Sequence, residues 1–284
     1  MITHSEAIVL QIRPWSKTSH IVTWLTPDHG RLITSIKGAC RPKSPFLGQY
    51  DLFYTCHLLF YTREHEGVHI AKECEPHHRR DAIREHWRAA ALATYLVELT
   101  ARALPLREPH PEVYKLLSQT LDYLAEYSQS ARSLQTNPLL DCLIRYELHL
   151  LYFLGLLPDL SPCETCHDPH PEWFSFSLST GRLRCHHTGH HPSSENTISL
   201  HPSIQEAFTL LRNKVIAGRY PLHSEAAPAK KNGEKTKLPL GLSRFLGIFI
   251  TSHLDLPAAV RRVALELIET TPTQQTASQE SQQP

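Results

Sequence analysis

The sequence predicts an α+β protein with more than one domain: an N-terminal barrel of five strands, then an α-helical domain with an inserted hairpin that resembles a zinc knuckle. Three observations lead to this prediction. Apolar residues recur with a period of two before residue 80 and with a helical period after it. A C-x-x-C pair then interrupts the helical part. The chain has 284 residues, which suits two or three modest structural units.

Five short apolar segments, with no helical segment between them, predict the strands of an N-terminal domain over residues 1–80. Turn and loop sequences such as RPWSK, TPDHG and GACRPKSPFLGQ separate these segments. In GRLITSIK, the residues Leu32, Thr34 and Ile36 share one face, as a half-buried strand requires. An antiparallel, OB-like barrel fits five strands of this size. The expected strands cover residues 7–13, 19–25, 30–37, 50–62 and 68–72.

Residues 81–270 are predicted to form the α-helical domain, because helix-favouring residues there carry apolar side chains at helical spacing. A polar, basic segment over residues 223–237 predicts a mobile loop. The tail, residues 271–284, is too polar to pack and is expected to be disordered. The expected helices cover residues 80–104, 111–128, 137–156, 201–218 and 240–254.

Charge and cysteine content limit the classes of function. The chain has 29 basic and 28 acidic residues, so any surface for nucleic acid must be local. We expect a cytoplasmic protein with reduced thiols, because no N-terminal segment resembles a signal peptide and no apolar run has the length of a membrane span. Cys40, Cys56, Cys74 and Cys142 are isolated in the sequence and are expected to be buried apolar residues.

Basic residues are concentrated near the N-terminus. Residues 1–45 contain six basic residues and two acidic ones, and the loop from Lys37 to Lys43 carries three cations without an acidic neighbour. Cations near one groove bind phosphates, and an exposed aromatic ring stacks on bases. We expect Trp24, Phe53 and Phe60 in the core, whereas Trp15 fits DNA contact and packing equally. The predicted nucleic-acid-binding residues are Arg13, Trp15, Lys17, Arg31, Lys37, Arg41 and Lys43.

Cys163, Cys166 and Cys185 have the spacing of a structural zinc site with one ligand missing, because Thr188 stands where a second C-x-x-C pair would end. A neutral imidazole can supply the fourth ligand. We predict His190, because Gly189 lets the chain turn before it. His187 is the closest rival, and His186 and His191 are further candidates. The alternative is a degenerate site whose cysteines pack without metal.

The residue patterns resemble those of the RecO family of bacterial recombination mediators. The likeness rests on AIVL near the start, the T-P-D-H-G-R turn, the K-G-A-x-R-x-K-S run, and the C-x-x-C pair before a hairpin and a third cysteine. The resemblance implies an OB-fold that binds single- and double-stranded DNA, anneals complementary strands, and acts at the nucleoid. It also implies work with RecR and RecF to load RecA onto DNA coated by single-stranded-DNA-binding protein. Family members that bind zinc use four cysteines, and this sequence has three in the segment.

Two other classes of function fit parts of the sequence. Pro162 with Cys163 and Cys166 matches half of the zinc-deaminase pattern, and His110-Pro111-Glu112 lies upstream. The separation between these two motifs is long, and the sequence between them predicts helices. A helical scaffold that binds only protein is the second alternative, and it predicts no DNA affinity for residues 1–80. The sequence contains no Walker loop and no G-x-S-x-G elbow, so we expect no catalytic activity.

Overall fold

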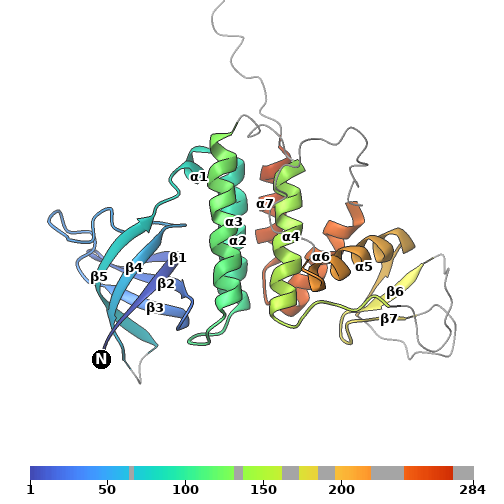
Figure 1. Cartoon of the computed structure of the whole chain (residues 1–284), viewed down its shortest axis with the longest axis horizontal. Helices are drawn as coiled ribbons and strands as arrows, with labels where there is room; N and C mark the ends of the chain where they lie inside the picture. The colour runs from blue at the N-terminus through green and yellow to red at the C-terminus, as the bar shows by residue number, and fades with distance from the viewer. Residues whose placement is uncertain (64–66, 131–136, 162–172, 185–195, 219–239, 271–284) are drawn as a thin grey trace, which may run out of the picture.

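The computed structural model of the chain describes residues 1–63, 67–130, 137–161, 173–184, 196–218 and 240–270. The β-barrel lies at one end of the molecule, long helices lie in the middle, and a small sheet lies at the other end (Figure 1). The last helix returns to the middle, beside the first long helix after the barrel. Within the described residues, the barrel contacts the rest of the protein through one side, and the remainder of its outer surface is free of such contacts.

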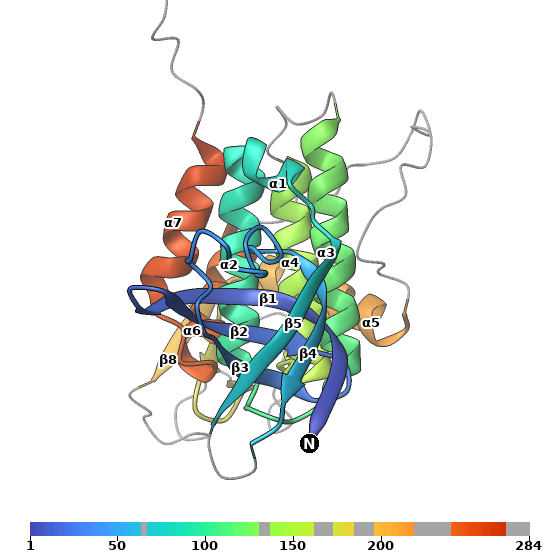
Figure 2. The ribbon, with the colours of Figure 1, turned by 90° about the vertical axis from the view of Figure 1, so that its left-hand side faces the viewer.

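The N-terminal barrel has five strands and closes in the order β1-β2-β3-β5-β4, which confirms the predicted OB-like barrel (Figure 2). The prediction of a wholly antiparallel barrel was wrong, because β3 and β5 pair in parallel. A closed ring with an odd number of strands cannot alternate direction throughout, so one parallel pair is required. The strands are β1 (Ile2–Ser16), β2 (Ser19–Thr26), β3 (Gly30–Ile36), β4 (Thr55–Tyr61) and β5 (Val68–His78).

Several strand boundaries differ from the prediction: β1 begins at residue 2 and not at 7, and β5 ends at residue 78 and not at 72. The segment RPWSK, expected as a loop, belongs mostly to β1, because Pro14 lies beside a register shift between Pro14 and Ser16. A bulge accommodates a proline that cannot donate a ladder hydrogen bond. Conversely, β4 begins only at Thr55. Phe53 has φ of 72°, in the left-handed region, which ends any extended run before it.

The barrel interior is a separate hydrophobic core. Leu32, Thr34 and Ile36 are buried on one face of β3, as their alternation predicts. The fully buried ring of Trp24 donates a hydrogen bond from Nε1 to Oγ1 of Thr34 at 2.8 Å, which satisfies its one polar atom. Phe60 is also buried here.

Seven helices are present in the described part of the chain. Most follow the predicted ranges, but the expected helix over residues 80–104 is broken at His86, whose φ of −119° and ψ of 100° are extended. The His86 ring accepts a hydrogen bond from the backbone N–H of Ala89 and so caps the second helix. The helices are α1 (Ala82–Glu85), α2 (Trp87–Ala103), α3 (Pro111–Gln129), α4 (Asn137–Phe153), α5 (Pro202–Ile216), α6 (Leu240–His253) and α7 (Ala258–Glu269).

A second sheet has the strand order β7-β6-β8. The hairpin of β6 (Phe174–Ser177) and β7 (Arg182–Arg184) confirms the hairpin expected in this segment, whereas β8 (Thr197–Leu200) was not predicted. Phe176 on β6 packs edge-on against Phe245 of α6, with ring centroids 5.2 Å apart. This contact joins the sheet to the helical core.

Helix α7 was also missed by the sequence analysis. It lies beside α2 and carries Arg261, which forms a bidentate ion pair with the buried Glu147 of α4. The hydroxyl of Tyr95 donates a third hydrogen bond to Glu147 at 2.6 Å. Burial lowers the pKa of Arg261, but Glu147 more than compensates, so the pKa of Arg261 lies above its ordinary value. The pair ties the last helix to the centre of the helical domain.

The barrel and the helices share the larger hydrophobic core, to which Ile8, Leu10 and Leu25 of the barrel contribute. Arg80 joins the two parts at the end of β5. Its side chain is 1% exposed, and it binds Asp122 of α3 through Nε at 2.6 Å. One terminal nitrogen donates to the carbonyl oxygen of Phe53 and to Oγ1 of Thr55. The other donates to the hydroxyl and the carbonyl oxygen of Ser118.

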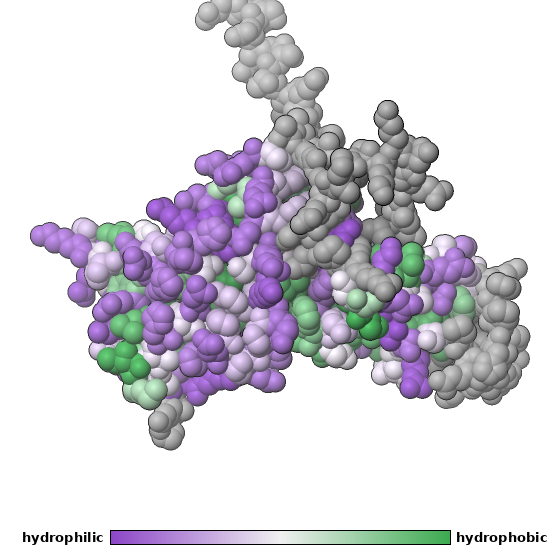
Figure 3. Space-filling model, viewed as in Figure 1, coloured by the Kyte–Doolittle hydropathy of each residue, from purple (hydrophilic) through white to green (hydrophobic). Residues whose placement is uncertain are grey.

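Hydrophilic residues cover most of the face in Figure 3, and smaller hydrophobic patches interrupt them. None of the described helices combines the length and the apolar character that crossing a membrane would require.

Replacing Arg80 by methionine should lower the free energy of unfolding by about 3 kcal/mol, because it leaves buried acceptors without a donor. Urea denaturation measures this change. The neighbouring Arg79 has a side chain that is 58% exposed, so Arg79→Met is the matched control and should leave the urea midpoint near that of the wild type. Equal midpoints for the two variants would contradict the role of Arg80.

Candidate nucleic-acid interface

Two segments meet at the end of the barrel that lies away from the helices. The backbone N–H of Cys40 donates to the carbonyl oxygen of Thr18 at 3.1 Å, and the N–H of Gly38 donates to Oγ of Ser19 at 3.2 Å. Gly38 has φ of 71°, which glycine adopts without strain. These contacts hold the loop that follows β3 against the turn between β1 and β2.

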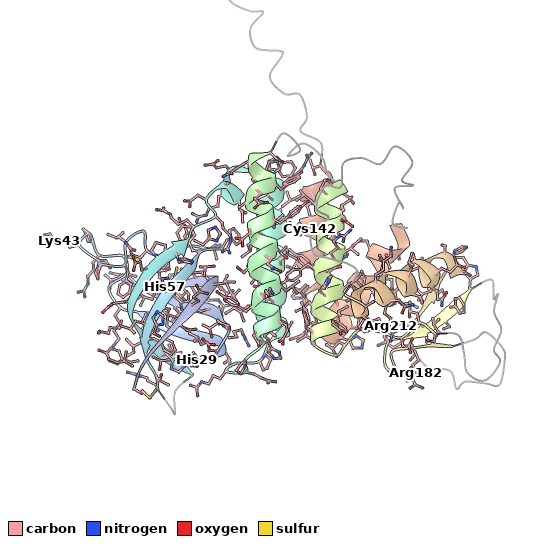
Figure 4. All side chains as sticks on the ribbon, viewed as in Figure 1. His29, Lys43, His57, Cys142, Arg182 and Arg212 are labelled. Carbon is pink, nitrogen blue, oxygen red and sulfur yellow. The ribbon has the colours of Figure 1, made fainter. Side chains whose placement is uncertain are left out.

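This arrangement gathers four of the predicted DNA-binding cations. Lys17 lies in the β1–β2 turn, and Lys37, Arg41 and Lys43 lie in the loop; all four are exposed. Within the described residues, none of the four forms a salt bridge. Lys43 lies at the edge of the barrel farthest from the helices (Figure 4). We call these four cations, together with Trp15, the hairpin-tip surface.

Trp15 is the exposed aromatic residue of this surface. Its side chain is 60% exposed, whereas Trp24, Phe53 and Phe60 are buried, as predicted for those three. Trp15 lies on β1, two residues before Lys17. An exposed indole next to cations has the geometry required to stack on an unpaired base whose phosphates the cations bind.

Arg13 and Arg31 lie apart from the loop cations. Both line a cleft of about 290 Å³ between the barrel and the helical domain. β1 contributes Arg13, the start of β3 contributes Arg31, and α2 contributes Arg102 on the facing wall. The full lining is Gln11, Arg13, Arg31, Glu98, Ala101, Arg102, Leu254 and Asp255.

Arg31 is anchored through its backbone. Its carbonyl oxygen accepts a hydrogen bond from the N–H of Arg107 at 2.9 Å. Its side-chain Nε is buried and has no hydrogen-bond partner among the described residues. Burial lowers the pKa of Arg31, as expected for a cation that loses water without gaining an anion. The sequence pattern did not indicate Gln11 or Arg102, because only the packing of α2 on the barrel places them beside Arg31.

Cys40 is exposed, so the prediction that it is a buried residue was wrong, whereas Cys56, Cys74 and Cys142 are buried as predicted. The Sγ atom of Cys40 lies 3.2 Å from Nε2 of His20. The other nitrogen of this ring lies 2.7 Å from the hydroxyl oxygen of Tyr50. The loop that carries Cys40 runs over the barrel surface, which explains its exposure.

The predicted zinc ligands Cys163, Cys166, Cys185 and His190 all lie outside the described residues, as does the rival His187. The described residues that flank them include a parallel bridge between Asp159 and Arg182. Among the residues that the structure describes, no group of three or more potential ligands could hold a metal ion.

The chain matches two family models. Residues 1–80 match the N-terminal domain of recombination protein O, and residues 84–216 match its C-terminal domain. The chain belongs to the RecO family. A DNA repair protein RecO from Exiguobacterium sibiricum is 30% identical over 204 residues, which cover 72% of this chain and 76% of the relative. Relatives of the same name from Bacillus cereus and Bacillus anthracis are 25% identical over 257 residues, 89% of this chain and 96% of theirs.

Membership of the RecO family makes this chain a DNA repair protein. In the described part of the chain, His110 precedes α3 and lies near Glu108, with Nε2 3.8 Å from Oε1. RecO relatives are named for repair and not for a catalysed reaction, so the deaminase interpretation gains no support.

Iodoacetamide should alkylate Cys40 at least about tenfold faster than Cys142 in the folded protein at about pH 8, because only the exposed thiol forms an accessible thiolate. Burial raises the pKa of Cys142 to about 12. Peptide mass spectrometry gives the rate at each cysteine separately. In urea the two rates should converge. Equal rates in the folded protein would show that the loop does not expose Cys40.

Proposed function

We propose that this RecO-family protein is a non-catalytic mediator of homologous recombination that binds single- and double-stranded DNA through its barrel and promotes strand annealing. The observation that carries this proposal is the hairpin-tip surface. It combines four exposed cations, which have no ion-pair partners in the described residues, with one exposed tryptophan. Such a surface binds phosphates through counterion release and stacks bases without reading their sequence.

Annealing requires no bond chemistry from the protein. Two complementary strands repel each other through their phosphates, and cations on one surface screen this repulsion. Base pairing then supplies the free energy that joins the strands. Counterion release supplies most of the free energy of DNA binding. The annealing activity should therefore decline steeply as the salt concentration rises.

We further propose that the protein works in the cytoplasm, at the nucleoid, with RecR and with single-stranded-DNA-binding protein. RecF and RecA would be its functional partners in loading recombinase onto coated DNA. These assignments rest on family membership. The placement of the cations supports them indirectly, because a barrel that uses one end for DNA leaves the helical domain free for protein contacts.

The variant Lys37→Ala/Arg41→Ala/Lys43→Ala should weaken binding of a single-stranded oligonucleotide and reduce the slope of log affinity against log salt by about 2, at about 0.7 for each lost phosphate contact. Fluorescence anisotropy at several salt concentrations measures both quantities. A matched variant, Lys72→Ala/Lys115→Ala/Arg262→Ala, removes three cations outside the hairpin-tip surface and should keep the wild-type slope. The same slope for both triple variants would refute DNA binding by the hairpin-tip surface.

We also propose one structural zinc ion, held by Cys163, Cys166, Cys185 and His190. The described flanks support it: the bridge between Asp159 and Arg182 aligns two chain segments in parallel. Cys163 follows Asp159 by four residues, and Cys185 follows Arg182 by three. Thiolate and imidazole donors suit zinc, and four protein ligands would leave no position for a reactive water.

Purified protein should contain about one zinc ion per chain, measured by atomic emission after dialysis. His190→Ala should lower the zinc content, and His187→Ala should retain it. If the two variants exchange these results, His187 is the fourth ligand. A metal-free wild type that still binds DNA would reject the zinc proposal and leave the mediator proposal intact.

A further inference from the structure

The cleft between the barrel and α2 concentrates positive charge for which no ligand has yet been assigned. Three guanidinium groups converge on it, from Arg13, Arg31 and Arg102. The buried Nε of Arg31 has no acceptor within the described residues. A buried donor without a partner costs free energy, so the cleft favours a ligand that brings an acceptor with negative charge.

The charges in the cleft are not balanced by its own carboxylates. Glu98 is bound by Nε of Arg102 at 2.7 Å, which pairs these two charges with each other. A terminal nitrogen of Arg102 also donates to the carbonyl oxygen of Asp255 at 3.2 Å. The remaining charged residues of the lining are Arg13, Arg31 and Asp255. An excess of one positive charge remains.

The cleft is continuous with the hairpin-tip surface. Gln11 and Arg13 line it, and both lie on β1, which continues through Trp15 to the turn that holds Lys17. A strand rises about 3.3 Å per residue, so the distance along the chain from Gln11 to Lys17 is about 20 Å. A register shift lies between Pro14 and Ser16, so Trp15 does not follow the regular alternation of β1.

We propose that this cleft binds a phosphate group of single-stranded DNA, and that the DNA path runs from the hairpin-tip surface along β1 to α2. Arg31 donates from Nε to a phosphate oxygen, Arg13 holds the same phosphate from the open side, and Gln11 donates from its side-chain amide. A guanidinium group matches the geometry of a phosphate through paired donors. Arg102 adds charge from the helical domain, so both domains hold the strand. This inference rests on the proposed DNA binding.

Two substitutions that should change DNA affinity in opposite directions test the cleft. Arg31→Gln should weaken binding of an oligonucleotide of about 16 nucleotides by about three- to tenfold and lower the salt slope by about 0.7. Asp255→Asn removes one of the two carboxylates that line the cleft and should strengthen binding by about two- to threefold. Asp255 has φ of 48°, which asparagine tolerates. Arg262→Gln, at an exposed position on α7, is the control and should match the wild type.

The outcomes separate the cleft from the proposed function. If the Lys37/Arg41/Lys43 variant loses DNA binding while Arg31→Gln and Asp255→Asn both equal the wild type, the cleft inference is wrong and the function stands. If the wild type does not bind DNA at all, both the proposed function and the cleft inference are wrong. The melting temperature of Arg31→Gln shows whether this variant folds. If it does not fold, Asp255→Asn alone tests the cleft.

Inorganic phosphate distinguishes a DNA contact from a site for a free anion. We expect millimolar phosphate to raise the melting temperature of the wild type more than that of Arg31→Gln, and to compete with DNA for the cleft. If phosphate stabilises only the wild type but Arg31→Gln keeps the full affinity and salt slope for DNA, the cleft holds a free anion, and the proposed path is overturned.

Discussion

The placement of Arg80 is the constraint on which the arrangement of the two domains depends. All five N–H donors of its guanidinium group have acceptors, and these come from the barrel, at Phe53 and Thr55, and from α3, at Ser118 and Asp122. A buried cation is tolerated only with such complete pairing. The group therefore fixes the orientation of the barrel on the helices far more strictly than apolar contact alone would.

This orientation divides the outer surface of the barrel into parts with different tasks. Ile8 and Leu25 face the helices and bury their side chains in the common core. The far end of the barrel stays open and carries the hairpin-tip surface. Between them lies the cleft, where the barrel is close enough to α2 for side chains of both to meet. A small rotation of the barrel would close the cleft or expose the apolar face.

The local features of the fold could be predicted from the sequence. Alternation identified the buried face of β3, and helical spacing identified α3 and α4, because both signals depend only on near neighbours. The helix break at His86 was missed because an imidazole cap is a weak sequence signal. Helix α7 was missed although its local signal is present. Its buried residues Arg261, Ala264 and Ile268 have helical spacing. What the sequence could not show is the pairing of Arg261 with Glu147, which lies 114 positions earlier in the chain.

In the candidate site, too, features set by sequence neighbours could be predicted, and features set by tertiary packing could not. The loop cations were predictable because they are neighbours in sequence, and the structure places Lys17 beside them through the hydrogen bond between Cys40 and Thr18. The exposure of Cys40 could not be predicted from its neighbours. The cleft could not be predicted either, since Arg31 and Arg102 are brought together only by the packing of α2 on the barrel.

The joint at Arg80 also affects how the protein is made. The barrel is complete once residue 78 has left the ribosome, because all its strands pair with one another. Its partner acids and hydroxyls on α3 follow about 40 residues later, which takes about 2 to 8 seconds at ordinary rates of synthesis. During that interval the nascent barrel displays Ile8, Leu10 and Leu25 to solvent. A barrel that folds within that interval keeps this apolar face exposed until α2 and α3 pack on it.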